Sequence, residues 1–191
     1  MRRYLPALVA VLVVVGIALY VIHAMPVHES EQPPASLAKL VPDLQPKTLP
    51  AAGFADESGA RLSLATFRGR VVLLNLWATW CAPCVQELPA LAALQRALPG
   101  LAIVAVSEGR ENGAEARTFL KSHGAGSLKA YVDSDHAFLA ALGAFGLPLS
   151  LLIDASGRER ARAVGPAQWN DPAAIAWLRQ FMAQLAAARA S

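Results

Sequence analysis

The pentapeptide Trp-Cys-Ala-Pro-Cys at residues 80–84 constrains the fold of this chain more than any other stretch. It follows an apolar run at residues 71–77, which predicts a central strand that is covered on both faces. It leads into residues 85–98, whose apolar positions have helical spacing. We therefore expect a strand, a tight turn and a helix that begins at Cys81. Unpaired backbone N–H groups and the helix dipole at such an end stabilise a thiolate, the reactive form of cysteine.

Cys84 lies three residues after Cys81, close enough to close a small disulfide ring once Cys81 has attacked a partner. The chain has no other cysteine for structural cross-links. Its four histidines have no paired spacing, which argues against a structural zinc site. Valine stands at position 85, where covalent haem attachment would need histidine. We expect a catalytic pair with no metal and no cofactor.

Length and composition predict one domain with a terminal appendage, since the chain has 191 residues of which 55% are apolar. The net charge of +3 comes from scattered arginines, such as Arg158, Arg160 and Arg162, without a basic block. This pattern gives nucleic-acid binding little support.

The N-terminal residues 5–22 carry no charge and, at about 1.5 Å per residue, almost span a hydrocarbon core of roughly 30 Å. This run is longer than the apolar region of a typical signal peptide and has a poor cleavage site, which favours an uncleaved signal-anchor over a cleaved signal peptide. Two arginines precede it and two glutamates follow it. The positive-inside rule then predicts a cytoplasmic tip at residues 1–4 and a single-pass protein of the bacterial inner membrane, with its soluble domain in the oxidising periplasm.

Residues 23–50 contain six prolines and no sustained apolar period. Such a composition predicts an extended extracytoplasmic linker. The soluble domain is then expected at residues 51–189.

Within that domain, turn signals and apolar periodicity predict alternating strands and helices. The expected elements are a hairpin at 54–64, strands at 71–77, 101–106 and 129–132, helices at 85–98, 111–123 and 135–144, a hairpin of 149–154 with 158–164, and a helix from 171. A strand, helix and strand in succession form a right-handed parallel unit, whereas the last hairpin is antiparallel. We therefore predict an α/β domain with a central mixed sheet and helices on both faces.

This arrangement resembles the thioredoxin fold. The string Trp-Ala-Thr-Trp-Cys-Ala-Pro-Cys at 77–84, Glu87-Leu88-Pro89 after it, and Gly-Leu-Pro at 146–148 are similar to the membrane-anchored, TlpA-like thiol–disulfide oxidoreductases. That family includes the cytochrome-maturation reductases ResA and CcmG, also called DsbE. The resemblance covers about residues 40–188, and its full motif is far more specific than a bare C-x-x-C.

Cys81 is the expected nucleophile, and Cys84 is expected to resolve the mixed disulfide. Glu87 lies one helical turn below Cys84, where burial would raise its pKa and let it exchange a proton with that thiol. The resemblance implies this role, although a glutamate on a helix is more often solvated. Trp80 is expected to cover the disulfide and offer a contact surface.

The resemblance also implies that Pro148 has a cis peptide bond and faces the cysteine pair. Its ring and the backbone of Leu147 would form a docking edge for a substrate strand. Leu149 and Ser150 depart from the threonines or glutamate that are frequent at this point of the family.

Three functions compete. The leading hypothesis, by resemblance, is a reductase that keeps cysteines of apocytochrome c or of copper-site assembly proteins reduced and is recharged by a membrane electron donor. The direction of transfer is not written in the motif, because it depends on the reduction potential. A copper chaperone is the second hypothesis, since two thiolates suit Cu(I). A thiol peroxidase is the third, although such enzymes place threonine three residues before the reactive cysteine, and Thr79 is two before Cys81.

Overall fold

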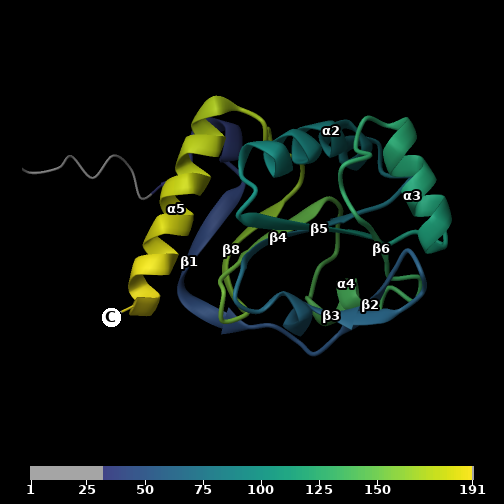
Figure 1. Ribbon diagram of the computed structural model, residues 1–191, viewed down its shortest axis with the longest axis horizontal. Coiled ribbons are helices and arrows are strands. Elements are labelled where there is room, and N and C mark those ends of the chain that lie inside the picture. Colours follow the sequence, from purple (N-terminus) through teal and green to yellow (C-terminus); the bar gives the residue numbers. More distant parts are fainter. Residues whose placement is uncertain (1–31, 191) are drawn as a thin grey trace, which may run out of the picture. The chain divides into compact units, whose positions relative to one another are not determined.

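The computed structural model describes residues 32–190 (Figure 1). The expected cytoplasmic tip and signal-anchor at residues 1–22 lie outside this range. Between residues 32 and 190, no helix combines the length and apolar character that crossing a membrane requires.

One mixed sheet of eight strands forms the centre of the domain, in the order β1-β8-β7-β4-β5-β6-β2-β3. β4 pairs in parallel with β5 and antiparallel with β7, while β6 is parallel to β5. This arrangement confirms the predicted mixed sheet. The strands are β1 (Leu40–Thr48), β2 (Gly53–Asp56), β3 (Arg61–Ser63), β4 (Val71–Trp77), β5 (Leu101–Ser107), β6 (Ala130–Val132), β7 (Leu149–Ile153) and β8 (Arg158–Val164).

β4 and β5 are apolar on both faces because each face carries a separate core. Leu73 and Trp77 of β4 belong to one buried cluster, and Leu74 and Leu76 belong to the other. Period-2 alternation of side chains produces this division. The strand is thus fixed in register from both sides, which fixes the point where it ends and the cysteine motif begins.

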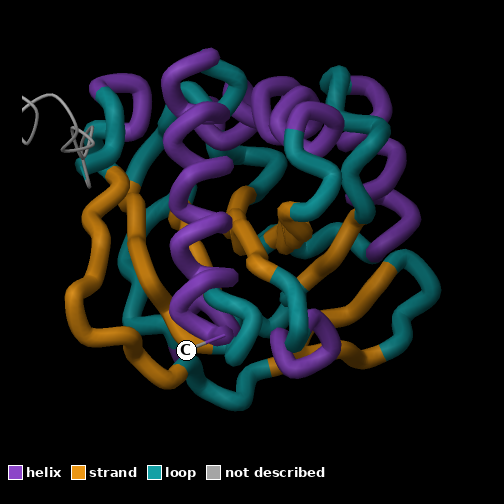
Figure 2. Tube along the Cα trace, turned by 60° about the vertical axis from the view of Figure 1, so that its left-hand side comes forward, coloured by secondary structure: helices purple, strands orange, loops and turns teal. Residues whose placement is uncertain are grey.

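Helices cover the two faces unequally. α2 (Ala82–Ala97), α3 (Gly113–Ser122) and α5 (Pro172–Ala190) contribute to the cluster that contains both cysteines. The short α4 (Ala137–Ala141) packs with the β2–β3 hairpin and the 3-10 turn Leu64–Phe67 on the other face. Figure 1 shows α2 and α3 above the sheet and α4 below it. In Figure 2, α5 is the long helix that ends at the C-terminal label.

The prediction that residues 23–50 form an extended linker is wrong for the second half of that range. Residues 40–48 form β1, which pairs antiparallel with β8, and a 3-10 turn at Ala35–Leu37 precedes it. Leu37 and Leu40 are buried in the core. β1 is an edge strand whose register shifts between Pro42 and Lys47. Prolines are tolerated at sheet edges and bulges, which is how a proline-rich segment joins the sheet.

The helix expected at 135–144 is shorter than predicted. α4 spans Ala137–Ala141, and its N-cap residue is His136, which has a left-handed backbone at φ 54°. The carboxylate of Asp133 accepts a hydrogen bond from the N–H of Phe138 at 2.6 Å. This contact from the end of β6 satisfies a backbone N–H in the first turn, where His136 makes no side-chain cap hydrogen bond.

Candidate active site

The two cysteines form a disulfide, with an S–S distance of 2.04 Å, at the start of α2. Cys81 is the N-cap residue and has an extended backbone, and the N–H of Val85 donates to its carbonyl at 3.0 Å. Pro83 lies in the first turn, where a missing N–H costs no helical hydrogen bond. The predicted strand–turn–helix unit is therefore present, and the Cys81 sulfur lies at the positive end of the helix dipole.

Both sulfurs lie in the core cluster, but not equally deep. Cys84 is fully buried, whereas 5% of Cys81 is exposed. A partner protein can therefore approach Cys81 first. Cys81, the more exposed of the two, is the residue for which the role of nucleophile is predicted, and that role stays a prediction.

Glu87 is buried one turn below Cys84, with 4% of the residue exposed. Burial raises the pKa of its carboxyl from 4.5 to about 7. The Ala167 backbone N–H, which donates at 3.1 Å, and the Asn75 side-chain amide, which donates at 2.7 Å, act in the opposite direction. A carboxyl with a pKa near neutrality can both take up and return a proton at physiological pH. The alternative of a solvated glutamate is wrong.

A polar network that sequence reasoning missed holds Glu87 in place. Asn75 on β4 donates from the same amide nitrogen to Glu87 and to the Ser150 hydroxyl, at 3.0 Å in the latter case. The indole N–H of Trp169 also lowers the pKa of Glu87. This buried Nε1 nevertheless makes no hydrogen bond of good geometry to any residue between 32 and 190. A buried asparagine in an otherwise apolar central strand was the available signal, because buried polar groups need partners.

The loop before β7 places the remaining predicted residues. The Leu147–Pro148 peptide bond is cis, as predicted. Leu149, the next residue, pairs with Leu76 of β4, so Pro148 lies at the end of the sheet from which the cysteine motif leaves. Leu147 packs against the cluster that contains both cysteines. Trp80 is 70% exposed beside Cys81, where a partner could contact it.

A second buried carboxyl, Glu108, follows β5. Its N–H donates to the Trp77 carbonyl at 2.8 Å, which places it beside the end of β4. Neither carboxyl oxygen has a hydrogen-bond partner among the described residues, and the ring Nδ1 of His136 lies 3.6 Å from Oε2. Burial, reinforced by Asp133, raises the pKa of Glu108 to about 8.

The mixed sheet, its helices and the cysteine pair at the start of α2 define a redox protein with a thioredoxin-like fold. The chain belongs to the Redoxin family, whose model matches residues 40–176.

Characterised relatives support this assignment. The chain is similar to the thiol-disulfide oxidoreductase ResA of Bacillus subtilis (strain 168), with 35% identity over 105 residues, or 54% of this chain and 58% of ResA. The match thus spans less than two thirds of ResA. It is also similar to the thiol:disulfide interchange protein DsbE of Pseudomonas aeruginosa, with 30% identity over 149 residues and 78% of each chain.

Solved structures agree on the fold. The crystal structure of a thiol:disulfide interchange protein DsbE from Chlorobium tepidum superposes with a TM-score of 0.61 and 28% identity. The match covers 74% of this chain and 97% of that one.

Proposed function

We propose that this chain is a membrane-anchored, extracytoplasmic thiol–disulfide oxidoreductase that reduces disulfides in partner proteins. The observation that carries the proposal is the Cys81–Cys84 disulfide at the start of α2, one turn above the buried carboxyl of Glu87. Relatives named as thiol–disulfide oxidoreductases support the same chemistry.

The reaction begins from the dithiol form. The Cys81 thiolate attacks one sulfur of the partner's disulfide, so that an S–S bond forms between the proteins and the partner's second sulfur leaves as a thiolate. Cys84 then attacks the Cys81 sulfur, which closes the intramolecular disulfide and releases the partner's first sulfur. Two electrons pass to the partner, and Cys81 and Cys84 end in the oxidised form.

Glu87 serves the second attack. Cys84 is fully buried, so water cannot readily accept its proton. The Glu87 carboxylate lies one turn away and takes this proton, which makes Cys84 a nucleophile. Because its pKa is about 7, the carboxyl releases the proton again at neutral pH. Asn75 is a positioning residue, since it acts by holding the carboxyl.

The exposed ring of Trp80 and the Leu147–Pro148 edge form the docking surface around Cys81. An extended partner segment can place its disulfide over Cys81 while its backbone lies along the edge before β7. The burial of Pro148 and the partial exposure of Leu147 support a backbone contact there with little side-chain recognition.

The proposal extends to the cellular setting, which the N-terminal sequence and the family resemblance support. An anchor at residues 5–22 would hold the domain on the periplasmic side of the bacterial inner membrane. Its partners would be apocytochrome c or proteins that assemble the copper site of cytochrome oxidase, and a membrane electron donor would regenerate the dithiol.

Trapping tests the reaction. A full-length Cys84→Ser variant, expressed in the native membrane, should stall as a mixed disulfide through Cys81, and the partner can be identified after non-reducing separation. The double variant Cys81→Ser, Cys84→Ser is the matched control and should trap nothing. Equal trapping by both variants would overturn the proposal.

The reduction potential tests the direction of transfer. A reductase should have a value near the roughly −270 mV of thioredoxin, and a value near the roughly −120 mV of DsbA would contradict it.

A further inference from the structure

Among the side chains that the structure describes, four large apolar ones are strongly exposed: Val41 at 66%, Trp80 at 70%, Phe145 at 101% and Val164 at 59%. Trp80 adjoins Cys81, and Phe145 lies three residues before Pro148. Val41 and Val164 lie instead on β1 and β8. Clustered exposed apolar side chains commonly mark interaction sites.

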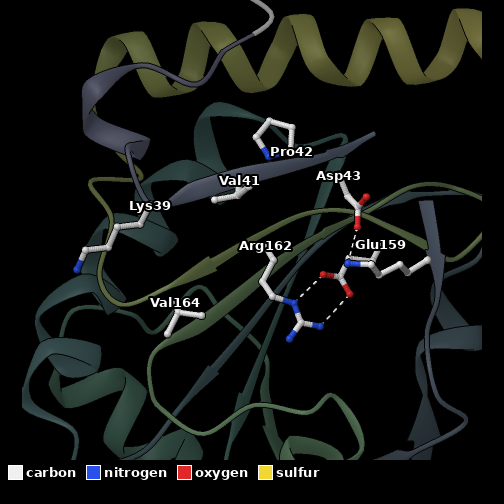
Figure 3. A pocket seen from close by; sticks show the side chains of 8 residues that line it. Lys39, Val41, Pro42, Asp43, Glu159, Arg162 and Val164 are labelled. Carbon is white, nitrogen blue, oxygen red and sulfur yellow. Dashed lines mark hydrogen bonds and ion pairs between the residues drawn. The ribbon is translucent and has the colours of Figure 1, made fainter. Parts of the chain in front are cut away.

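Val41 and Val164 line one groove of about 560 Å³ between β1 and β8, which we call the β1–β8 groove. Its lining residues are Lys39, Val41, Pro42, Asp43, Lys47, Glu159, Arg162 and Val164. Figure 3 shows Lys39, Val41 and Val164 towards one end and Asp43 with Glu159 towards the other. The groove therefore has an apolar end beside a lysine and a charged end.

The charged end is internally neutralised. Arg162 donates to both carboxylate oxygens of Glu159, at 2.7 and 2.9 Å, and to the Leu142 carbonyl at 3.0 Å. Lys47 lies 2.7 Å from the Asp43 carboxylate. Lys39 is exposed and has no ion pair or hydrogen bond within the described part of the chain. The apolar end thus carries one positive charge that its own groove does not balance.

The apolar end adjoins the redox site. Val164 pairs with Leu149, the residue after Pro148, and the N–H of Gly165 donates to the Pro148 carbonyl at 2.8 Å. Lys39 lies against the same turn, because a Cβ at Gly165 would be 2.6 Å from its Nζ. Lys39 also lowers the pKa of Glu87. A polypeptide that crosses the Pro148 edge can therefore continue into the groove.

We propose that the β1–β8 groove binds a segment of the redox partner that flanks the partner's cysteine, with an apolar side chain between Val41 and Val164 and a carboxylate at Lys39. The inference rests on the proposed function and specifies its substrate class: protein disulfides next to an apolar, acidic segment. Charge complementarity identifies this occupant, since a basic segment would meet Lys39 without compensation.

Synthetic peptides test the groove. Each contains one cysteine in a mixed disulfide with thionitrobenzoate, whose release is followed by absorbance. A spacer of about three to eight residues, each spanning up to ~3.4 Å, separates the cysteine from a test segment on either side. The segment is leucine with glutamate, leucine with lysine, or serine only. The enzyme is the reduced full chain in detergent.

For the wild type, we expect the second-order rate constant of single-turnover thionitrobenzoate release to be about threefold higher for the glutamate peptide than for the lysine peptide at low salt, and the difference to shrink in high salt. Lys39→Glu should invert this ratio. Lys121→Glu, a charge reversal on the exposed face of α3, is the matched control and should leave the ratio unchanged. Val41→Ser should remove most of the advantage of leucine over serine.

The two proposals fail in different ways. Equal rates for all three peptides in every variant would overturn the proposal that the β1–β8 groove binds a partner segment. The proposed oxidoreductase function would still stand. An equal ratio of glutamate-peptide to lysine-peptide rates in Lys39→Glu and Lys121→Glu would overturn the groove proposal as well. No thionitrobenzoate release from any peptide, including the serine peptide, would overturn the proposed function itself.

Discussion

The two buried glutamates of this domain differ in what surrounds them. Glu87 accepts hydrogen bonds from Asn75 and Ala167, and its pKa rises only to about 7. Glu108 has no hydrogen-bond donor on either oxygen among the described residues, and its pKa rises to about 8. Burial without donors and with Asp133 nearby produces a neutral acid, whereas burial with donors produces a carboxyl that is balanced near physiological pH. The second kind is suited to repeated proton transfer.

The largest expected effect is the loss of proton transfer at one glutamate only. Glu87→Gln should slow the attack of Cys84 by about 100-fold near pH 8, because general bases contribute roughly 10² or more. The acid limb near pH 7 should also disappear. Rapid mixing of the dithiol protein with dithiobis(nitrobenzoate) from pH 5 to 9 would show both, because the attack of Cys81 releases the first thionitrobenzoate and the attack of Cys84 on the resulting mixed disulfide releases the second. Glu108→Gln is the matched control and should change the rate less than about twofold; similar losses in the two variants would remove the distinction.

The variants Glu87→Gln and Glu108→Gln should also differ in their free energy of unfolding. The pKa of Glu108 is about 8 when folded and 4.5 ordinarily, so between these values the folded state binds more protons than the unfolded state. Its contribution to stability is complete below about pH 4.5 and is lost as the pH rises through about 8. Glu108→Gln should remove this slope and gain about 1–3 kcal/mol over the wild type at high pH.

Urea unfolding at pH 5 and pH 8.5 checks that gain. Glu87→Gln should lose stability in the same assay, because its new amide would direct N–H groups at the donors Asn75 or Ala167. If the Glu108→Gln variant has a lower free energy of unfolding than the wild type at both pH values, the surroundings of Glu108 stabilise its carboxylate, contrary to this prediction.

Removing a donor should make Glu87 resemble Glu108. Asn75→Leu deletes a hydrogen bond that favours the charged carboxyl, so the pKa of Glu87 should rise above about 7. The rate at pH 7 should fall by about tenfold and recover at higher pH, in keeping with the energy of a hydrogen bond to a charged group. A pH–rate profile separates this shift from a simple loss of activity. A uniform decrease at every pH would argue against positioning by Asn75.

The smallest effect concerns the neighbour of Glu108. His136 has a left-handed backbone that glycine adopts without the cost of a Cβ. His136→Gly removes the 3.6 Å contact with Glu108 and relieves that cost, so stability should change by less than about 1 kcal/mol. Thermal unfolding would measure it. A loss above about 2 kcal/mol would show that the histidine supports Glu108 after all.

Local signals made part of the site predictable. The cysteine pair, the strand before it and the helix after it lie within one stretch of chain, so spacing alone predicts their arrangement. The cis bond before Pro148 came from the family resemblance, because most X–Pro bonds are trans.

Non-local contacts made the rest unpredictable. Asn75 and Ala167 reach Glu87 from 12 and 80 residues away in sequence, and no periodicity connects them. β1 has a composition typical of a linker and becomes a strand because β8 offers an edge to pair with. In both cases the deciding partner is brought close only by the folded sheet.

The position of Trp169 gives the domain an optical reporter of its own. An indole responds in its emission to the charge of a neighbouring acid, and this one lies buried next to the carboxyl at the centre of the proposed proton transfer. Fluorescence of the unlabelled protein, compared with a Trp169→Phe variant, would therefore follow that carboxyl through each redox cycle in real time.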